Sequence, residues 1–450
     1  MTQHRTPTGR SRLVVVAFLA LTAVALVQWR EVPATVRWYG LAVFTLLSIK
    51  LMASVVARAY VATADGLRGL DRLYVATVVP VHNEDPKTFR RALEALLAQT
   101  RPPDAIVVVD DASESTACRD LARSYTEAFA AVGTELRVIR FDTNRGKRLG
   151  IAEVVRTFDQ ADVYLGVDSD TVLHPSAVRN GLMPFSDPRV RAVTGLVLAL
   201  NAGSNLLTRL IDVRYANAFL YERSAYSSVG SVLCACGSLA FYHGPTLRTY
   251  LDDFLSQTFL GRPATYGDDR RLTNYCLTEG TVVLQPTALA WTLVPERLGH
   301  FIRQQTRWNK SFFRESIWVL ANMRLRKPAT WLAGIELTSW LVFTAVLLWA
   351  LLVMPWIVGP GIWISYLTAI CLLSYVRSIR YIDMPGPHGR SIRQRLVGFA
   401  LSPLYGLLHV FLLLPLRFYS LATLRDNGWG TRNAVEVGEA PAEPVHAGAG

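Results

Sequence analysis

The sequence predicts an α/β domain with a mostly parallel sheet, joined to an α-helical membrane region. Between residues 62 and 296, apolar runs of strand length alternate with segments of helical pattern, which is typical of a parallel sheet with helices on both faces. Apolar segments long enough to cross a membrane lie on either side of this block. Since 51% of the residues are hydrophobic and only 18% are charged, the composition is not that of an ordinary soluble protein.

Five parts are expected along the chain. Two transmembrane helices come first, followed by a soluble domain on the cytosolic side, interfacial helices, a second membrane region and a disordered tail, with bounds 1–61, 62–296, 297–328, 329–424 and 425–450. The first two spans are Leu13–Val27, which is short, and the stretch from Trp38 to Val61. No small-residue cleavage site follows the first apolar run, so we interpret it as an uncleaved span.

The C-terminal membrane region is harder to divide. Trp331–Met354 and Ile362–Val376 are span candidates, and a third apolar stretch, Leu396–Leu424, is broken by Pro403 and Pro415. That stretch suits either one tilted span or a re-entrant pair, and five full spans would leave the two termini on opposite sides of the membrane.

A few charged residues fall within the predicted spans: Lys50, Arg58, Glu336 and Arg417. Most lie near span ends, where snorkelling to the membrane interface explains them. The chain as a whole carries a net charge of +12, yet it has no nucleic-acid-binding motif. Because the basic residues gather beside the apolar spans, the expected partner is membrane lipid and not nucleic acid.

Paired aspartates follow two of the predicted strands. Ala105–Val109 ends in Asp110-Asp111, and Val163–Val167 is followed by Asp168-Ser169-Asp170. The carboxyl ends of parallel strands meet at one edge of a sheet, where ligands bind. An Asp-x-Asp motif there suits Mg²⁺ or Mn²⁺ held against a diphosphate, although a solvated turn explains the same residues.

Two further runs follow strands at the same edge. The acidic groups after Pro80 and at Asp110 and Asp111 suit hydrogen bonds to a ribose or a uracil, while helix capping explains these runs equally well. The basic run Asn144-Arg145-Gly146-Lys147-Arg148 suits contact with phosphate. Taken alone, that run is more typical of a solvated turn.

Two motifs in the second half carry acidic and aromatic groups. In Gly267-Asp268-Asp269-Arg270, a carboxylate suits removal of a proton from an attacking hydroxyl, and an acidic helix N-terminus is the alternative. In Gln304-x-x-Arg307-Trp308, helical spacing places the three side chains on one face. An indole can support a sugar ring and a guanidinium can approach a pyrophosphate, whereas a Trp and Arg belt at the membrane interface is the alternative.

The order of these motifs is more specific than any one of them. Between membrane segments, it resembles that of the processive, inverting glycosyltransferases that make cellulose, chitin and hyaluronan, whose shared fold is a GT-A-type domain fused to a transmembrane channel. Within that group, Tyr266–Tyr275 and Arg303–Ser316 resemble the bacterial hyaluronan synthases more closely than the chitooligosaccharide synthases. The likeness covers roughly residues 40 to 432.

The resemblance implies a role for each matching residue on the donor side. Asp110 and Asp111 would help to hold uridine, and Lys147 would lie near the diphosphate. Asp168 and Asp170 would form the site for Mg²⁺ or Mn²⁺, with Asp170 as the more direct ligand.

On the acceptor side, the resemblance implies that Asp269 is the general base, with its neighbour Asp268 as the second candidate. The acceptor and pyrophosphate site would be lined by Gln304, Arg307 and Trp308. The segment from Trp429 to Arg432 would fold back to the active site, which favours the re-entrant interpretation of the last apolar stretch.

One segment departs from the family. Where the family commonly has Cys-Ser-Gly-Pro-Leu before a tyrosine, this chain has Ala235-Cys236-Gly237-Ser238-Leu239. The segment is expected near the acceptor sugar, so the change bears on acceptor binding and product identity.

The resemblance implies a multi-pass enzyme of the plasma membrane with a cytosolic catalytic domain. It would polymerise UDP-GlcNAc and UDP-GlcA into hyaluronan and conduct the growing polysaccharide outward. A synthase that uses only UDP-GlcNAc and makes a chitin-like product is the nearest alternative. A nucleotide-binding transporter or scaffold is the alternative from another class.

Overall fold

The computed structural model describes residues 34–264, 266–384 and 391–426. The first predicted span, Leu13–Val27, and the segment from Trp429 to Arg432 lie outside the described residues.

An eight-stranded sheet forms the centre of the soluble domain, with strand order β3-β2-β1-β4-β7-β6-β10-β5. Pairing is parallel from β3 to β4 and between β6 and β10, whereas β7 and β5 are antiparallel to their neighbours. Every residue of β2 is buried, as expected for a central strand covered on both faces. The strand bounds are β1 Val75–Val81, β2 Ala105–Asp111, β3 Glu135–Phe141, β4 Val163–Gly166, β5 Val172–Leu173, β6 Val190–Ala199, β7 Ala240–His243 and β10 Thr281–Thr292, with β8 Thr258–Phe259 and β9 Arg262–Pro263 as a separate hairpin.

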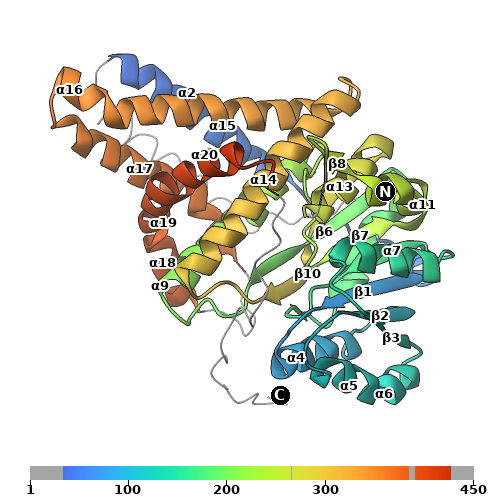
Figure 1. Ribbon diagram of the computed structural model, residues 1–450. Coiled ribbons are helices and arrows are strands. Elements are labelled where there is room, and N and C mark those ends of the chain that lie inside the picture. The colour runs from blue at the N-terminus through green and yellow to red at the C-terminus, as the bar shows by residue number, and fades with distance from the viewer. Residues whose placement is uncertain (1–33, 265, 385–390, 427–450) are drawn as a thin grey trace.

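Helices cover both faces of this sheet. Figure 1 shows α4, α5 and α6 on one face of the β1–β3 part and α7 on the other. In α4, Asp85 caps the first turn by accepting a hydrogen bond from the Thr88 backbone N–H, and Phe89, Leu93 and Leu96 are buried in the core. The helix bounds in this domain are α3 Ala64–Leu70, α4 Pro86–Leu97, α5 Ala117–Ser124, α6 Thr126–Ala131, α7 Lys147–Thr157, α8 Ala177–Leu182, η2 Met183–Ser186, α11 Gly244–Thr249, α12 Leu251–Ser256 and α13 Asp268–Glu279.

The predicted α/β architecture is therefore confirmed. The helical segment that follows β2 is broken at Tyr125 into α5 and α6. The helix that follows β3 begins at Lys147. It starts there because Gly146 adopts a positive φ of 80°, which turns the chain directly into the helix.

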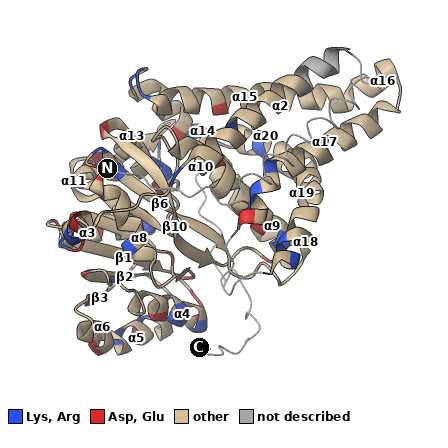
Figure 2. Ribbon diagram, turned by 180° about the vertical axis from the view of Figure 1, so that it is seen from behind, with Lys and Arg blue, Asp and Glu red and all other residues tan. Residues whose placement is uncertain are grey.

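Apolar helices form a second body that extends away from the sheet (Figure 1). Within the described residues, three segments are long and apolar enough to cross a membrane, namely 328–358, 362–383 and 392–422, and α2 contributes a shorter apolar part, 41–56. Few charged residues mark α15, α16 and α17 in Figure 2, whereas the sheet domain carries many. The bounds are α2 Ala34–Val56, α15 Pro328–Leu352, α16 Met354–Val358, α17 Ile362–Ser378, η4 Ile379–Asp383, α18 Ile392–Ala400, α19 Ser402–Leu408, η5 His409–Leu413 and α20 Leu414–Ala422.

The last apolar stretch is a bent run of helices. Pro403 lies in the first turn of α19, and Pro415 lies in the first turn of α20 after the π-helical turn η5. Proline removes a helical hydrogen bond at each place and accounts for the bends. As a result, α19 packs against α17 while α20 packs against α14.

Helices also connect the sheet to the apolar body. The chain after β6 forms α9 Leu206–Ala216, the π-helical turn η3 Asn217–Arg223 and α10 Ser224–Ser227, and the chain after β10 forms α14 Leu298–Asn322. Among them, α9 contacts both β6 and α19, α10 contacts α2, and α14 contacts α13, α15 and α20. These contacts bring the carboxyl edge of the sheet against the membrane helices.

Candidate active site

The aspartates at the end of β2 organise the loops around them. Asp111 accepts hydrogen bonds from the backbone N–H groups of Arg145 and Gly146, at 2.6 and 2.8 Å. Asp110 accepts one from the Ser113 backbone N–H at 2.9 Å and lies 3.4 Å from the Arg119 guanidinium. Both carboxylates are buried. Asp111 therefore holds the loop before α7 at the carboxyl edge of the sheet, next to Lys147, the first residue of α7, while Asp110 holds the loop after β2.

Lys147 joins the predicted metal motif to the predicted base. Its ammonium group lies 2.7 Å from Asp168 Oδ1 and 3.9 Å from Asp269 Oδ1. Burial lowers the pKa of Lys147, but the charges of Asp168 and Asp269 outweigh that effect and raise its pKa above the ordinary value. The group is thus a permanent cation between two carboxylates.

Asp269 lies in the first turn of α13, and a backbone N–H group from another segment holds its carboxylate. Its Oδ2 accepts a hydrogen bond from the Gly237 backbone N–H at 3.0 Å. Burial raises the pKa of its carboxyl; the charges of Asp168 and Asp268 act in the same direction, and Lys147 opposes them. A carboxylate with a raised pKa is a stronger base than an ordinary aspartate, as proton abstraction requires.

The residue that precedes α13, the helix that carries Asp269, must be glycine. Gly267 has a φ of 83°, and a Cβ atom there would lie 2.3 Å from Ser311 Oγ of α14. The close approach of α13 to α14 depends on the missing side chain. The neighbouring Asp268 forms a buried ion pair with Arg148, at 2.9 Å from its Nε.

Asp170 lies two residues beyond Asp168, and its Oδ1 accepts a hydrogen bond from Thr292 at 2.9 Å. No cluster of three or more His, Cys, Asp or Glu side chains suited to a metal ion occurs within the described residues. Mg²⁺ is usually held by one or two carboxylates together with substrate phosphates and water. The two carboxylates of the Asp-x-Asp motif are the donor type that such a shared site needs.

On α14, Arg307 and Trp308 line the same cavity as Lys147, Asp168 and Asp269. The Trp308 ring is partly exposed, and its centroid lies 6.4 Å from that of Tyr215. Gln304 is not among the residues that line the cavity and accepts a hydrogen bond from Gln305. Of the three residues of this motif, the structure thus brings two to the donor-side groups.

Known proteins share this combination of fold and motifs. The family model described as "Glycosyltransferase like family 2" matches residues 72–311. A hyaluronan synthase from Streptococcus pyogenes is 36% identical over 444 residues, which cover 96% of this chain and 99% of that protein. The chain belongs to the hyaluronan synthase family.

Other relatives agree with this placement. An N-acetylglucosaminyltransferase from Azorhizobium caulinodans is 34% identical over 80% of this chain and 87% of that protein. A solved mannosyltransferase from Pyrobaculum calidifontis, in complex with GDP-Man and Mn²⁺, superposes with a TM-score of 0.53 at 17% identity, covering 92% of this chain and 99% of that one. This likeness supports the GT-A fold. The predicted family and enzyme class are confirmed by the family match and by the hyaluronan synthase relative.

In this chain, the segment that departs from the family pattern is part of the site. Besides the Gly237 bond to Asp269, Ser238 Oγ donates a hydrogen bond to Asp168 Oδ2 at 2.6 Å. A Cβ atom on Gly237 would lie 2.5 Å from Asp269 Oδ1 and 2.6 Å from Lys147 Nζ. Sequence reasoning placed the segment near the acceptor sugar but missed these two contacts with the predicted catalytic groups.

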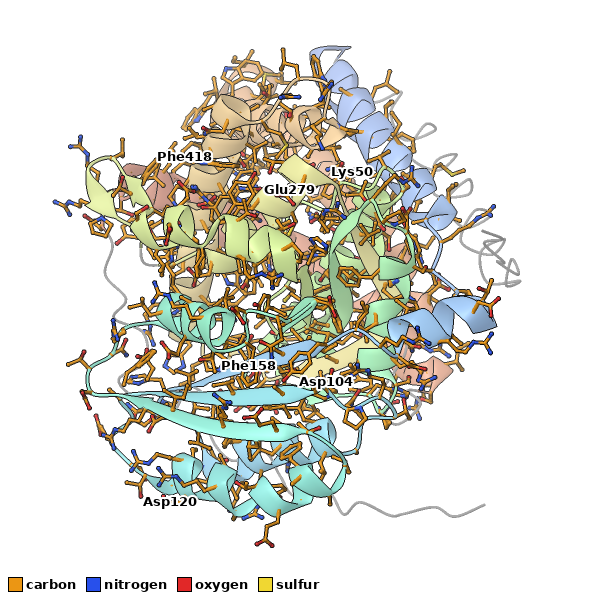
Figure 3. The ribbon with its side chains drawn as sticks, turned by 90° about the vertical axis from the view of Figure 1, so that its right-hand side faces the viewer. Lys50, Asp104, Asp120, Phe158, Glu279 and Phe418 are labelled. Carbon is orange, nitrogen blue, oxygen red and sulfur yellow. The ribbon has the colours of Figure 1, made fainter. Side chains whose placement is uncertain are left out.

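The cavity continues beyond the site, with a volume of about 1060 Å³. Its lining includes residues of α2, α15, α17 and α19 as well as those of the sheet edge. Lys50 and Glu336 both line it and pair with each other, and Tyr226 also donates a hydrogen bond to Glu336. Figure 3 labels Lys50 on the side of α2 that faces the other helices.

Snorkelling to the membrane interface is therefore the wrong explanation for Lys50, Glu336 and Arg417. All three line the internal cavity, where Lys50 and Glu336 neutralise each other. The sequence placed them on spans but did not reveal which side of each helix faces another helix.

Proposed function

We propose that this hyaluronan synthase polymerises UDP-GlcNAc and UDP-GlcA on the cytosolic side and conducts the polysaccharide outward through the membrane helices. The observation that carries the proposal is the continuity of one cavity. It begins at Lys147, Asp168 and Asp269 and extends among helices of membrane-spanning length. Synthesis and export can then share one enclosed path.

On the donor side, Asp110 and Asp111 hold the uridine, and Lys147 contacts the diphosphate of the UDP-sugar. Its ammonium group lies 2.7 Å from Asp168 Oδ1, so a diphosphate that enters this edge meets a cation already in position. Asp168 and Asp170 would hold Mg²⁺ or Mn²⁺, with Asp170 as the more direct ligand. When bound, the metal neutralises the charge that develops on the departing UDP.

On the acceptor side, Trp308 supports the terminal sugar of the growing chain, and Arg307, which lines the same cavity, completes the acceptor and pyrophosphate site. Asp269 removes the proton from the acceptor hydroxyl. The hydroxyl oxygen then bonds to the anomeric carbon on the face opposite UDP, and the bond from that carbon to the diphosphate oxygen breaks. The raised pKa of Asp269 supports its role as the proton acceptor.

The segment from Trp429 to Arg432 is proposed to return to this site. The described chain before it supports the proposal, because Lys310 of α14 donates a hydrogen bond to the backbone carbonyl of Asp426 at 3.1 Å. The same helix α14 carries Arg307 and Trp308. Asp426, which comes three positions before Trp429 in the sequence, is thus bound to the helix that lines the acceptor site.

A cytosolic position of the sheet domain is supported by the distribution of basic residues. Arg324, Arg326 and Lys327 precede α15 on the domain side, whereas the connection 353–361 between α15 and α17 contains no Lys or Arg. By the positive-inside rule, the domain faces the cytosol and the protein is a multi-pass protein of the plasma membrane. The five-part division of the chain is proposed on the same basis, with β1 to β10 inside 62–296 and α14 inside 297–328.

The test uses the purified full-length protein in lipid nanodiscs with Mg²⁺ or Mn²⁺. UDP release is followed with each UDP-sugar alone and with both, and with Asp269→Asn as the inactive control. We expect a hyaluronidase-sensitive polymer only when both donors are present. Sustained polymerisation with UDP-GlcNAc alone would instead identify a chitin-type product, and no turnover with any donor would contradict the enzymatic assignment.

A further inference from the structure

Beyond the reaction centre, one part of the cavity carries a surplus of positive charge. Arg214 of α9, Arg377 of α17 and Arg417 of α20 all line it, and so does the carboxylate of Glu222 in η3. Glu222 pairs with Arg377. The charges of Glu222 and Arg377 cancel each other, so the surplus positive charge belongs to Arg214 and Arg417.

Neither of these two arginines has a carboxylate within 4.0 Å in the part of the chain that the structure describes. Arg214 donates a hydrogen bond to the Tyr405 hydroxyl at 3.3 Å, and its Cζ lies 5.8 Å from the centre of the Trp308 ring. The Cζ of Arg417 lies 5.6 Å from the centre of the Trp340 ring. Their contacts are thus aromatic rings and a tyrosine hydroxyl, while the carboxylate of Glu222 pairs with Arg377.

The two guanidinium groups belong to one cluster. Arg214 donates a hydrogen bond to the hydroxyl of Tyr405, whose ring centroid lies 6.1 Å from that of His409. Arg417 follows His409 by about two helical turns in the same run of helices, and all four residues line the cavity. The Nδ1 atom of His409 is buried without a hydrogen-bond partner among the described residues. Placing like charges together beside membrane helices is unfavourable unless an anion compensates them. Elsewhere in the same cavity the chain supplies that compensation itself, since Lys50 pairs with Glu336.

We infer that Arg214 and Arg417 form a binding station for the carboxylate of the acidic sugar in the nascent polymer. The inference rests on the proposed function, in which every second sugar carries a carboxylate. Because Arg214 lies beside the Trp308 ring, the station follows directly on the platform proposed for the terminal sugar. Guanidinium groups bind carboxylates in a bidentate manner, and a neutral polymer would leave both arginines uncompensated.

The station predicts selective binding, which can be measured without synthesis. The full-length protein in lipid nanodiscs is titrated with a hyaluronan hexasaccharide and, separately, with an N-acetylglucosamine hexasaccharide of equal length, and tryptophan fluorescence reports the Kd. Arg214→Gln and Arg417→Gln test the station, and Arg214→Lys and Arg417→Lys keep the charge. Arg393→Gln is the matched control, because Arg393 is exposed on α18 and does not line the cavity.

We expect the wild type to bind the acidic oligosaccharide more tightly than the neutral one. Each Gln substitution should weaken acidic binding about tenfold or more, as loss of a charged hydrogen bond does. Binding of the neutral oligosaccharide should change less than about twofold, the Lys variants should keep part of the selectivity, and the Arg393 variant should match the wild type.

Equal weakening for both oligosaccharides would overturn the inference, because it would mean that the arginines only shape the cavity. Unchanged acidic binding in both Gln variants would overturn it as well. Inorganic phosphate is the competitor: if it displaces the acidic oligosaccharide at equal concentration, the site is a general anion site and not a sugar-acid station. Failure of the proposed function is seen separately, as absence of polymer from the two donors with the wild type.

Discussion

Asp268 and Asp269 are adjacent in the sequence, yet the fold gives them different surroundings. Asp268 forms a buried ion pair with Arg148, at 2.9 Å from its Nε. Asp269 accepts a hydrogen bond from the Gly237 backbone N–H and lies 3.9 Å from the Lys147 ammonium group. The first carboxylate is bound to a structural partner, whereas the second lies with the groups proposed to handle the donor.

This difference predicts opposite consequences for two conservative substitutions. Asp269→Asn should lower turnover by about 10²–10⁴-fold, because general base catalysis is lost, with little change in Tm. Asp268→Asn should lower the free energy of unfolding by about 3–5 kcal/mol, because Arg148 is left buried without its anion. UDP release and thermal unfolding measure the two effects, with Asp120→Asn, at the edge of the sheet domain (Figure 3), as the control. If the two substitutions exchange effects, the assignment of the base is wrong.

Substitution of Lys147 should change the pH dependence of turnover. Asp269 acts in its deprotonated form, so the rate rises as pH rises through its pKa. Burial raises that pKa and the charge of Lys147 opposes the rise, so Lys147→Gln should raise the pKa further and move the acidic limb of the profile to higher pH. The measurement is UDP release against pH at saturating donor, and the exposed Lys87→Gln serves as the control. A limb that stays in place or moves to lower pH would rule out this coupling.

A single methyl group at residue 237 should disturb the site without unfolding the protein. The Cβ atom of Gly237→Ala would lie 2.5 Å from Asp269 Oδ1 and 2.6 Å from Lys147 Nζ. Both groups must move, and a displacement of about 1 Å can cost about 10²-fold in rate. Gly203→Ala is the matched control, since a Cβ atom there meets nothing within 4 Å. Wild-type turnover in the Gly237 variant would show that this contact does not position the reacting groups.

The buried carboxylate of Glu315 joins the helix of the base to the helix of the acceptor platform. It accepts hydrogen bonds from Arg271 and Asn274 of α13 and from Arg314 of α14. Glu315→Gln removes the carboxylate that contacts both buried guanidinium groups and leaves Arg271 with Asp253 alone, at 3.8 Å. The loss should cost about 3–5 kcal/mol in the free energy of unfolding. Denaturant unfolding measures this loss, with the exposed Glu127→Gln as the control. Equal stability of the two variants would refute the role of Glu315 as a structural link.

The sequence alone was enough to predict many of the residues that lie at the carboxyl edge of the sheet. The valine-rich strands β1 and β2 pair in parallel, so the residues that follow them had to gather at one edge. In contrast, the contact of Gly237 with Asp269 joins residues 32 positions apart, and the contact of Ser238 with Asp168 joins residues 70 positions apart. No local periodicity encodes such a pairing, and only the departure of residues 235–239 from the family pattern marked the segment as unusual.

The sequence by itself determined the alternation of strands and helices, the membrane-spanning lengths and the family, because these depend on hydrophobic period and on continuous motifs. Only the tertiary structure decided that Lys50 faces Glu336 and that Arg214 and Arg417 share one cavity. Membrane helices are apolar around most of their circumference, so their sequences carry little information about which side meets a neighbour. The packing of the helices decides which side of each one faces a neighbour. In this protein it brings charged residues from separate helices together in the lining of one cavity.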